Sequence, residues 1–211
     1  MVTCALPCPR QNDLVALPMH PLPSHKGRLL VAAPPLTDPN FDRTVVYMLE
    51  HSADGAVGVV INRLDDPFPG DLDDWVGIVS SPARLFYGGP VDRQALIGIA
   101  RTLSPAVPPA ADDDSETGWS AITPNLVSVD LASTPYAVDL EISDLRVFRG
   151  YSGWGPLQLE GELAGDAWLV VDADDADLFD DEPADLWRRV LARQGGRLAL
   201  LAKAPDDLEM N

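Results

Sequence analysis

Two apolar segments with a short turn-like stretch between them constrain the fold more than any other feature of the sequence. Residues 44–50 (TVVYMLE) and 56–62 (AVGVVIN) are nearly continuous apolar runs rich in β-branched side chains, a pattern typical of strands covered on both faces. The stretch between them, 51–55, ends in Asp-Gly, and glycine tolerates the positive φ of a tight hairpin turn. The sequence therefore predicts two neighbouring antiparallel strands that are buried on both sides.

Weaker signals of the same kind extend along the chain. Short apolar runs predict further strands at 28–33, 85–87, 95–101, 126–131, 145–148 and 167–173. Apolar residues spaced three and four apart predict helices at 71–80 and 183–194, a shorter helix is expected at 156–163, and 197–204 fits either state. A hairpin combined with scattered helices indicates an α+β fold and not a regular alternation of strands and helices.

The net charge restricts the classes of partner. The 211 residues include 15 Lys and Arg against 33 Asp and Glu, which gives a formal net charge of −18. Affinity for nucleic acid comes largely from Lys and Arg that displace counterions from phosphates, so nucleic acid is an unfavourable partner, as is an anionic membrane surface. No run reaches the roughly 18 apolar residues that span a bilayer, and no signal-peptide pattern is present. We therefore expect a cytoplasmic protein without a membrane partner.

The N-terminal segment 1–26 contains five prolines among polar residues and shows no periodicity. This composition predicts a flexible tail and places the folded domain at 27–211. Cys4 and Cys8 both lie in the tail, a placement that provides no disulfide framework for the domain.

Acidic stretches in the domain are interpreted as solvated surface. Segment 102–118 carries several prolines and three consecutive aspartates, which predicts an exposed loop. The carboxylate-rich region 172–185 lacks the alternating ligands and central glycine of a calcium loop. We expect no metal site and no cofactor.

Several segments together resemble the AlgH/YqgE-like family. They are 27–34 (GRLLVAAP), 38–46 (DPNFDRTVV), 58–63 (GVVINR), 88–91 (GGPV) and 150–160 (GYSGWGPLQLE), with Trp168 following. The resemblance runs from about residue 27 to the C-terminus and implies a single α+β domain with a bent, mixed or antiparallel sheet flanked by helices. The family carries a transcriptional-regulator label but no established catalytic or metal-binding residues. The sequence departs from the family at Leu64, where proline is usual, and at Ser152, where alanine is usual.

Residues 149–155 are predicted to form a loop after the strand at 145–148, and the glycine-rich segment 150–155 within it is the main candidate for a ligand site. Its three glycines let the backbone approach a ligand, and it leads into a predicted helix whose free N–H groups attract phosphate or carboxylate. Its two aromatic rings can stack on a planar group. The alternative is a tight strand-to-helix turn whose aromatic side chains fill the core. The candidate residues are Gly150, Tyr151, Gly153, Trp154 and Gly155.

Ser152 in this segment does not fit a hydrolase nucleophile. The nucleophile elbow G-x-S-x-G requires glycine two residues after the serine, where this chain has Trp154. The histidines are His20, His25 and His51, and the first two lie in the predicted tail. We therefore predict no catalytic residues.

Five further residues are candidates with a structural alternative each. His51 could act as an acid–base group or be an ordinary loop histidine. Arg43 could bind a ligand or pair with a neighbouring aspartate, and Asn62 could bind a ligand or cap a turn. Gly88 and Gly89 could approach a ligand or form only a backbone turn.

The leading interpretation is a non-catalytic regulatory or protein-interaction domain, with a protein as partner. It rests on the lack of a nucleophile–base set, a metal cluster and a nucleotide fingerprint in the sequence. The alternative is an enzyme or sensor for a small anionic or nucleotide-like ligand bound at 150–155. Direct DNA binding is a third hypothesis, which the net charge disfavours.

Overall fold

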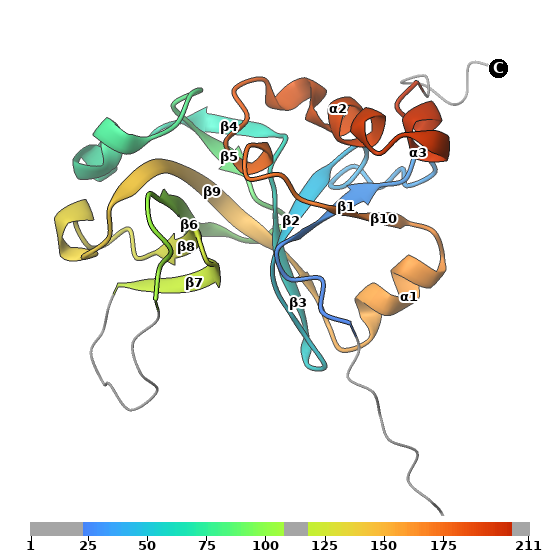
Figure 1. Ribbon diagram of the computed structural model, residues 1–211, viewed down its shortest axis with the longest axis horizontal. Helices are drawn as coiled ribbons and strands as arrows, with labels where there is room; N and C mark the ends of the chain where they lie inside the picture. Colours follow the sequence, from blue (N-terminus) through green and yellow to red (C-terminus); the bar gives the residue numbers. More distant parts are fainter. Residues whose placement is uncertain (1–22, 108–117, 204–211) are drawn as a thin grey trace, which may run out of the picture.

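Within residues 23–107 and 118–203, the part of the chain that the computed structural model describes, ten strands form one curled and mostly antiparallel sheet (Figure 1). The order in space is β10-β1-β2-β3-β9-β6-β8-β7, with β4 beside β5 and β5 parallel to β9. The strands are β1 (Arg28–Ala32), β2 (Val45–Ser52), β3 (Gly55–Val60), β4 (Leu64–Pro67), β5 (Arg84–Tyr87), β6 (Val91–Thr102), β7 (Trp119–Thr123), β8 (Leu126–Val129), β9 (Ile142–Trp154) and β10 (Trp168–Asp172). The fold is α+β as predicted, with strands dominating.

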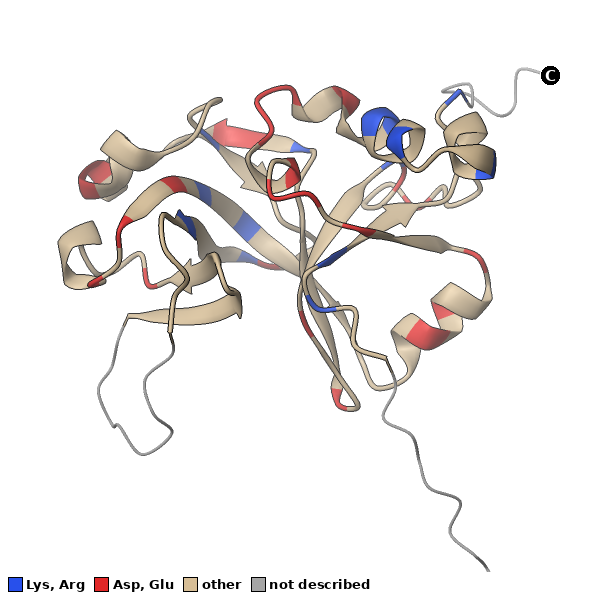
Figure 2. Cartoon of the chain, viewed as in Figure 1, with Lys and Arg blue, Asp and Glu red and all other residues tan. Residues whose placement is uncertain are grey.

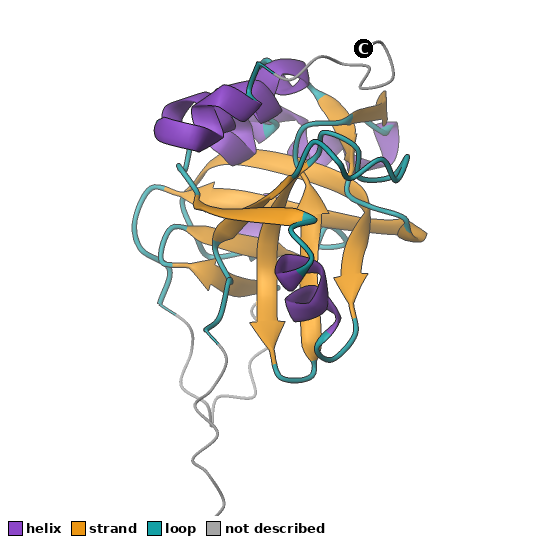
Figure 3. Cartoon of the chain, turned by 90° about the vertical axis from the view of Figure 1, so that its right-hand side faces the viewer, coloured by secondary structure: helices purple, strands orange, loops and turns teal. Residues whose placement is uncertain are grey.

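Short helices lie around the sheet, with α2 and α3 together on one side of it (Figure 3). They are α1 (Gln158–Ala164), α2 (Leu186–Arg193) and α3 (Gly196–Leu201), and the 3-10 helices η1 (Gly70–Ile78), η2 (Pro135–Ala137), η3 (Asp177–Phe179) and η4 (Pro183–Asp185). In the described part of the chain, none of these helices has the length and apolar character needed to cross a bilayer.

The predicted hairpin is confirmed, and its strands are buried on both faces. β2 and β3 pair antiparallel up to Ser52 opposite Gly55, and Gly55 takes a φ of +135° at the turn. Along β2 the side chains alternate between two hydrophobic clusters: Val45 and Tyr47 pack beneath α2, whereas Val46 and Met48 pack with α1. The continuous apolar run therefore reflects burial on both sides of the strand.

The 13-residue strand β9 joins the two halves of the sheet, and Figure 1 shows it sweeping across the molecule. Its C-terminal end pairs with β3 at Ser152 and Trp154. Its middle pairs with β6 on one side and runs parallel to β5 on the other. The prediction of a loop at 149–155 is thus wrong up to Trp154, because these residues are hydrogen-bonded strand.

The predicted helix at 71–80 is the 3-10 helix η1, interrupted at Leu72 (φ −107°, ψ 29°). Trp75 is buried and its indole N–H donates to the carbonyl oxygen of Ser133 at 3.0 Å. Val79, which completed the predicted apolar face, instead forms an isolated bridge with Leu145. The apolar residues that predicted one helix therefore belong partly to a 3-10 helix and partly to a β-bridge.

The C-terminal helices refine three further predictions. The helix expected at 156–163 begins at Gln158, after Leu157 with a φ of +60°. The best predicted helix, 183–194, is η4 followed by α2, and the undecided segment 197–204 contains the helix α3.

Much of the predicted tail, 1–22 with both cysteines, lies outside the described residues, as does 108–117 of the predicted acidic loop. The last tail residues are described and contact β2. Ser24 Oγ donates to the carbonyl oxygen of His51 at 3.1 Å, and Lys26 Nζ lies 2.8 Å from Glu50 Oε2.

Candidate functional site

The predicted glycines lie where β9 crosses the turn that follows β5. A Cβ placed on Gly88 would lie 2.1 Å from the carbonyl oxygen of Gly150, and one on Gly89 would lie 2.3 Å from the backbone of Tyr151. Gly150 itself has a φ of +69°. The Gly88 N–H donates to the carbonyl oxygen of Arg149, and its own carbonyl accepts from the Val60 N–H, both at 2.9 Å. These glycines let three backbone segments touch one another.

The neighbouring side chains of β9 are used internally. Ser152 is fully buried, and its hydroxyl donates to the carbonyl oxygen of Gly88 at 3.2 Å. Trp154 is buried, and its indole N–H donates to Glu162 at 2.8 Å. Trp168 donates to the same carboxylate oxygen at the same distance. Gly153, opposite Val57 in β3, and Tyr151, opposite Val91 in β6, continue the strand, and Gly155 follows it, with its N–H donating to Gln158.

His51 lies within β2 and is held by partners that are distant in the sequence. Its Nδ1 accepts the backbone N–H of His25 at 3.1 Å, so its Nε2 carries the proton that faces Glu160 Oε1 at 2.9 Å. The rings of His25 and His51 stack with centroids 5.1 Å apart. Burial, followed by the proximity of His51 and Arg28, holds the pKa of His25 below its usual range. Glu160 could not be predicted as the partner of His51, because 109 residues separate the two.

Arg43 and Asn62 meet at the other end of the hairpin. The Asn62 side chain accepts the backbone N–H of Val45 at 2.8 Å and donates to the carbonyl oxygen of Arg43 at 2.9 Å. Arg43 has a φ of +51°, and its guanidinium lies 4.8 Å from the ring centroid of Trp187. Asn62 therefore braces a turn, which agrees with the structural alternative for this residue.

Two hollows open on either side of Leu64, and only Asn62 of the predicted residues lines one of them. The first, called the acidic groove, has a volume of about 510 Å³ and is lined by Asn62, Leu64, Glu182, Pro183, Ala184 and Asp185. The second, called the arginine hollow, has a volume of about 350 Å³ and is lined by Asn40, Arg63, Leu64, Asp65, Tyr87 and Arg93.

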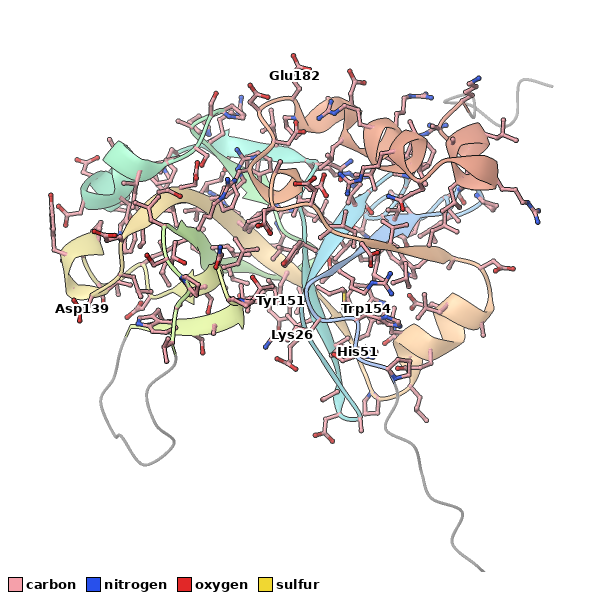
Figure 4. All side chains as sticks on the ribbon, viewed as in Figure 1. Lys26, His51, Asp139, Tyr151, Trp154 and Glu182 are labelled. Atoms are coloured by element: carbon pink, nitrogen blue, oxygen red, sulfur yellow. The ribbon has the colours of Figure 1, made fainter. Side chains whose placement is uncertain are left out.

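The predicted residues are therefore not gathered around one cleft. Figure 4 shows Glu182, on the rim of the acidic groove, at the opposite side of the molecule from His51 and Trp154. The two regions lie at opposite ends of the hairpin β2–β3, with Asn62 after β3 and His51 near the end of β2.

Comparison with known proteins shows the family to which this chain belongs. The model of the AlgH-like family matches residues 29–199. The chain belongs to the AlgH-like family. UPF0301 proteins of Streptomyces avermitilis and Streptomyces coelicolor are 42% and 43% identical over 190 and 187 residues, which is 88% of this chain and 94% of each relative.

Two solved structures of similar proteins share the fold. A crystal structure of a Corynebacterium diphtheriae protein superposes with a TM-score of 0.74 at 30% identity, covering 86% of this chain and 93% of that one. The solution structure of the AlgH protein from Pseudomonas aeruginosa gives a TM-score of 0.58 at 29% identity, covering 87% and 96%.

Within this AlgH-like chain, three of the segments that carry the family resemblance contribute to the arginine hollow or lie next to its lining residues. Asn40 belongs to the segment 38–46, and Arg63 to 58–63. Tyr87 directly precedes the segment 88–91, and Arg93 follows it by two residues. Polar residues within or next to these segments, such as Arg63 and Tyr87, could have pointed to the hollow. The glycines that were chosen as candidates do not line it.

Proposed function

We propose that this AlgH-like chain is a non-catalytic interaction domain that docks a segment of a partner protein in the acidic groove. The observation that carries the proposal is the groove itself, an apolar floor with a rim of free negative charge. Leu64 is 45% exposed there, beside Pro183 and Ala184. An exposed aliphatic surface in a concave site is typical of interaction surfaces.

The rim of the groove indicates the chemistry of the partner. The carboxylates of Glu182 and Asp185 are exposed, and neither lies within 4.0 Å of a cation among the described residues. Figure 2 shows further acidic residues on β4 and on the segment that leads to α2. Electrostatic complementarity therefore favours a segment in which an aliphatic side chain is flanked by Lys or Arg.

The internal use of the reactive side chains supports a role that does not involve bond breaking. Ser152 is sealed in the core with its hydroxyl on a backbone carbonyl. Both ring nitrogens of His51 are occupied, one by a backbone N–H and one by Glu160. A general base must reach the proton it removes within about 3 Å, and neither group lines the acidic groove or the arginine hollow.

A selection experiment tests the proposal without assuming a partner sequence. Random peptides displayed on phage are selected on the full chain and counter-selected on the variant Leu64→Ser. We expect enriched peptides with an aliphatic residue between basic residues, and a loss of affinity of at least about tenfold, or about 1.4 kcal/mol, on Leu64→Ser. Leu200→Ser is the matched control, because Leu200 is also exposed but lies on α3.

Peptides that bind Leu64→Ser as tightly as the unchanged chain, or enriched sequences without basic residues, contradict docking at the acidic groove.

A further inference from the structure

The arginine hollow lies next to the acidic groove but has the opposite chemistry. It is formed where the turn at 38–42, the start of β4, the end of β5 and the start of β6 come together. Its volume of about 350 Å³ is within the range of small-molecule sites.

Arg63 is fixed in the hollow without an ion pair. Its Nη1 donates to the carbonyl oxygens of Pro39 and Asn40 at 2.8 and 3.0 Å, and its Nη2 donates to that of Asp42 at 2.7 Å. Among the described residues no carboxylate lies within 4.0 Å of this guanidinium. The side chain is therefore held rigid by neutral acceptors, and its positive charge is not cancelled by an adjacent anion.

Arg93 brings a second guanidinium to the same place. Its Cζ lies 4.8 Å from the ring centroid of Tyr87, and its Nη2 lies 3.1 Å from Asp65 Oδ2. The side chain of Arg93 is half exposed, so donors of its planar group remain accessible to solvent. Counting Arg63, Arg93 and Asp65, the hollow has a local charge of +1 in a chain of net charge −18.

Tyr87 and Asn40 complete the wall between the two arginines. The Tyr87 hydroxyl donates to Asn40 Oδ1 at 3.0 Å, which orients the side-chain amide and leaves its N–H₂ as a donor. Burial raises the pKa of Tyr87, the charges of Arg93 and Arg63 lower it, and the charges of Asp38 and Asp65 raise it. Both arginines therefore lie close enough to act on the same hydroxyl, in agreement with the geometry.

We infer that the arginine hollow binds the oxyanion group, phosphate or carboxylate, of a small molecule, with Arg63, Arg93 and Asn40 donating the hydrogen bonds. Planar guanidinium groups match the two oxygens of such groups, and charge-assisted bonds of this kind are the stronger ones. None of the residues that line this hollow belongs to the segment 150–155, where the sequence suggested an anion, although Arg93 lies beside Gly150. The inference does not rest on protein docking in the acidic groove.

An NMR titration of the full ¹⁵N-labelled chain tests the inference with inorganic phosphate and with acetate, each against chloride at equal ionic strength. We expect saturable shifts of the backbone amides near Asn40, Arg63 and Arg93 with at least one probe, at a dissociation constant below about 50 mM. Saturation by phosphate only, by acetate only or by both supports the inference and identifies the oxyanion class.

Two variants with opposite expected effects on affinity distinguish a specific site from general electrostatic attraction of anions to the protein. Arg93→Gln removes one cation and should weaken binding about tenfold, whereas Asp65→Asn releases Arg93 and should tighten it severalfold. Arg28→Gln is the control, because Arg28 also pairs with an aspartate, Asp172, but lies on β1. Binding that does not saturate with either probe, or that is the same in Arg93→Gln and the unchanged chain, overturns the inference.

Discussion

Single side chains in this AlgH-like chain connect separate elements of secondary structure. Glu162 is the clearest case, because one of its carboxylate oxygens accepts the indole N–H groups of both Trp154 and Trp168, and the other accepts from Gln158. The two indoles pack edge to face with centroids 6.0 Å apart. One carboxylate therefore ties α1 to the ends of β9 and β10.

We predict that Glu162→Ala destabilises the chain by about 2–4 kcal/mol, because two buried indole N–H groups lose their acceptor. Chemical denaturation followed by tryptophan fluorescence measures the change. Glu182→Ala serves as the control, since the exposed Glu182 carboxylate has no described partner and its loss should stay within about 0.5 kcal/mol. Equal effects of the two substitutions would contradict the role given to Glu162.

His25 makes stability dependent on pH. Its pKa is held below the ordinary value of 6.5, mainly by burial, so the folded chain binds this proton less readily than the unfolded chain. Stability conferred by neutral His25 is complete above pH 6.5 and is lost as the pH falls toward the folded-state pKa.

We expect the melting temperature to fall between pH 7.5 and 5.5, a range in which ordinary carboxyl groups stay ionised. His25→Gln should reduce this fall, because glutamine does not titrate. A pH profile that is identical in the variant and the unchanged chain would show that His25 does not contribute.

At the scale of elements, the crossing of β9 over the turn after β5 depends on glycine. A Cβ on Gly88 or Gly150 would meet backbone atoms at 2.1 and 2.8 Å, respectively, and backbone cannot rotate away as a side chain can. Gly150 also has a positive φ, which strains any other residue.

We predict that Gly88→Ala costs more than about 3 kcal/mol or prevents folding, by the mechanism of overpacking in a closed space. Gly77→Ala is the matched control, because nothing lies within 4 Å of its Cβ position, and it should be neutral or stabilise by up to about 1 kcal/mol. Circular dichroism during thermal unfolding compares the two. A Gly88→Ala chain as stable as Gly77→Ala would contradict the proposed crossing.

An element could be predicted from the sequence where its burial leaves an apolar pattern. The hairpin β2–β3 has two nearly continuous apolar runs and helix α2 has apolar residues at helical spacing, and both were predicted. β4 (LDDP) was missed because an exposed strand of charged residues has no apolar signal. The segment 150–154 was misread as a loop because glycines that permit a close crossing look the same in sequence as glycines that form a loop.

At the scale of the molecule, the α+β fold class could be predicted, but the hollows could not. The arginine hollow combines residues from four separate segments, and their meeting depends on strand order, which local patterns do not encode. Asn62 was selected for its position at a strand end, and its neighbour Arg63, which lines the hollow, was passed over.

Arg146 connects strand β9 to two loops beside the curled sheet. This side chain is 1% exposed, lies 4.1 Å from the ring centroid of Phe86, and donates to the carbonyl oxygens of Ser81 and Asp180 at 2.5 and 2.8 Å. Burial lowers its pKa to about 10, so it is still charged at neutral pH. A single cation on β9 thus fastens the loop before β5 and the loop before η4.

We predict that Arg146→Met destabilises the chain by about 1–3 kcal/mol, because the two carbonyl groups lose their charged donor. Arg28→Met, which removes an exposed ion pair with Asp172, should cost less than about 1 kcal/mol. Urea denaturation of both variants checks the difference, and an Arg146→Met chain as stable as the unchanged one would contradict the fastening role.

Protein docking in the acidic groove is the central claim, and mapping the bound peptide by NMR tests it most directly. The most enriched peptide from the selection is titrated into the ¹⁵N-labelled chain and into Leu64→Ser. The account predicts that the largest amide shifts lie at 62–64 and 182–185 and disappear in the variant. Largest shifts elsewhere on the molecule, or shifts that persist in Leu64→Ser, would contradict it.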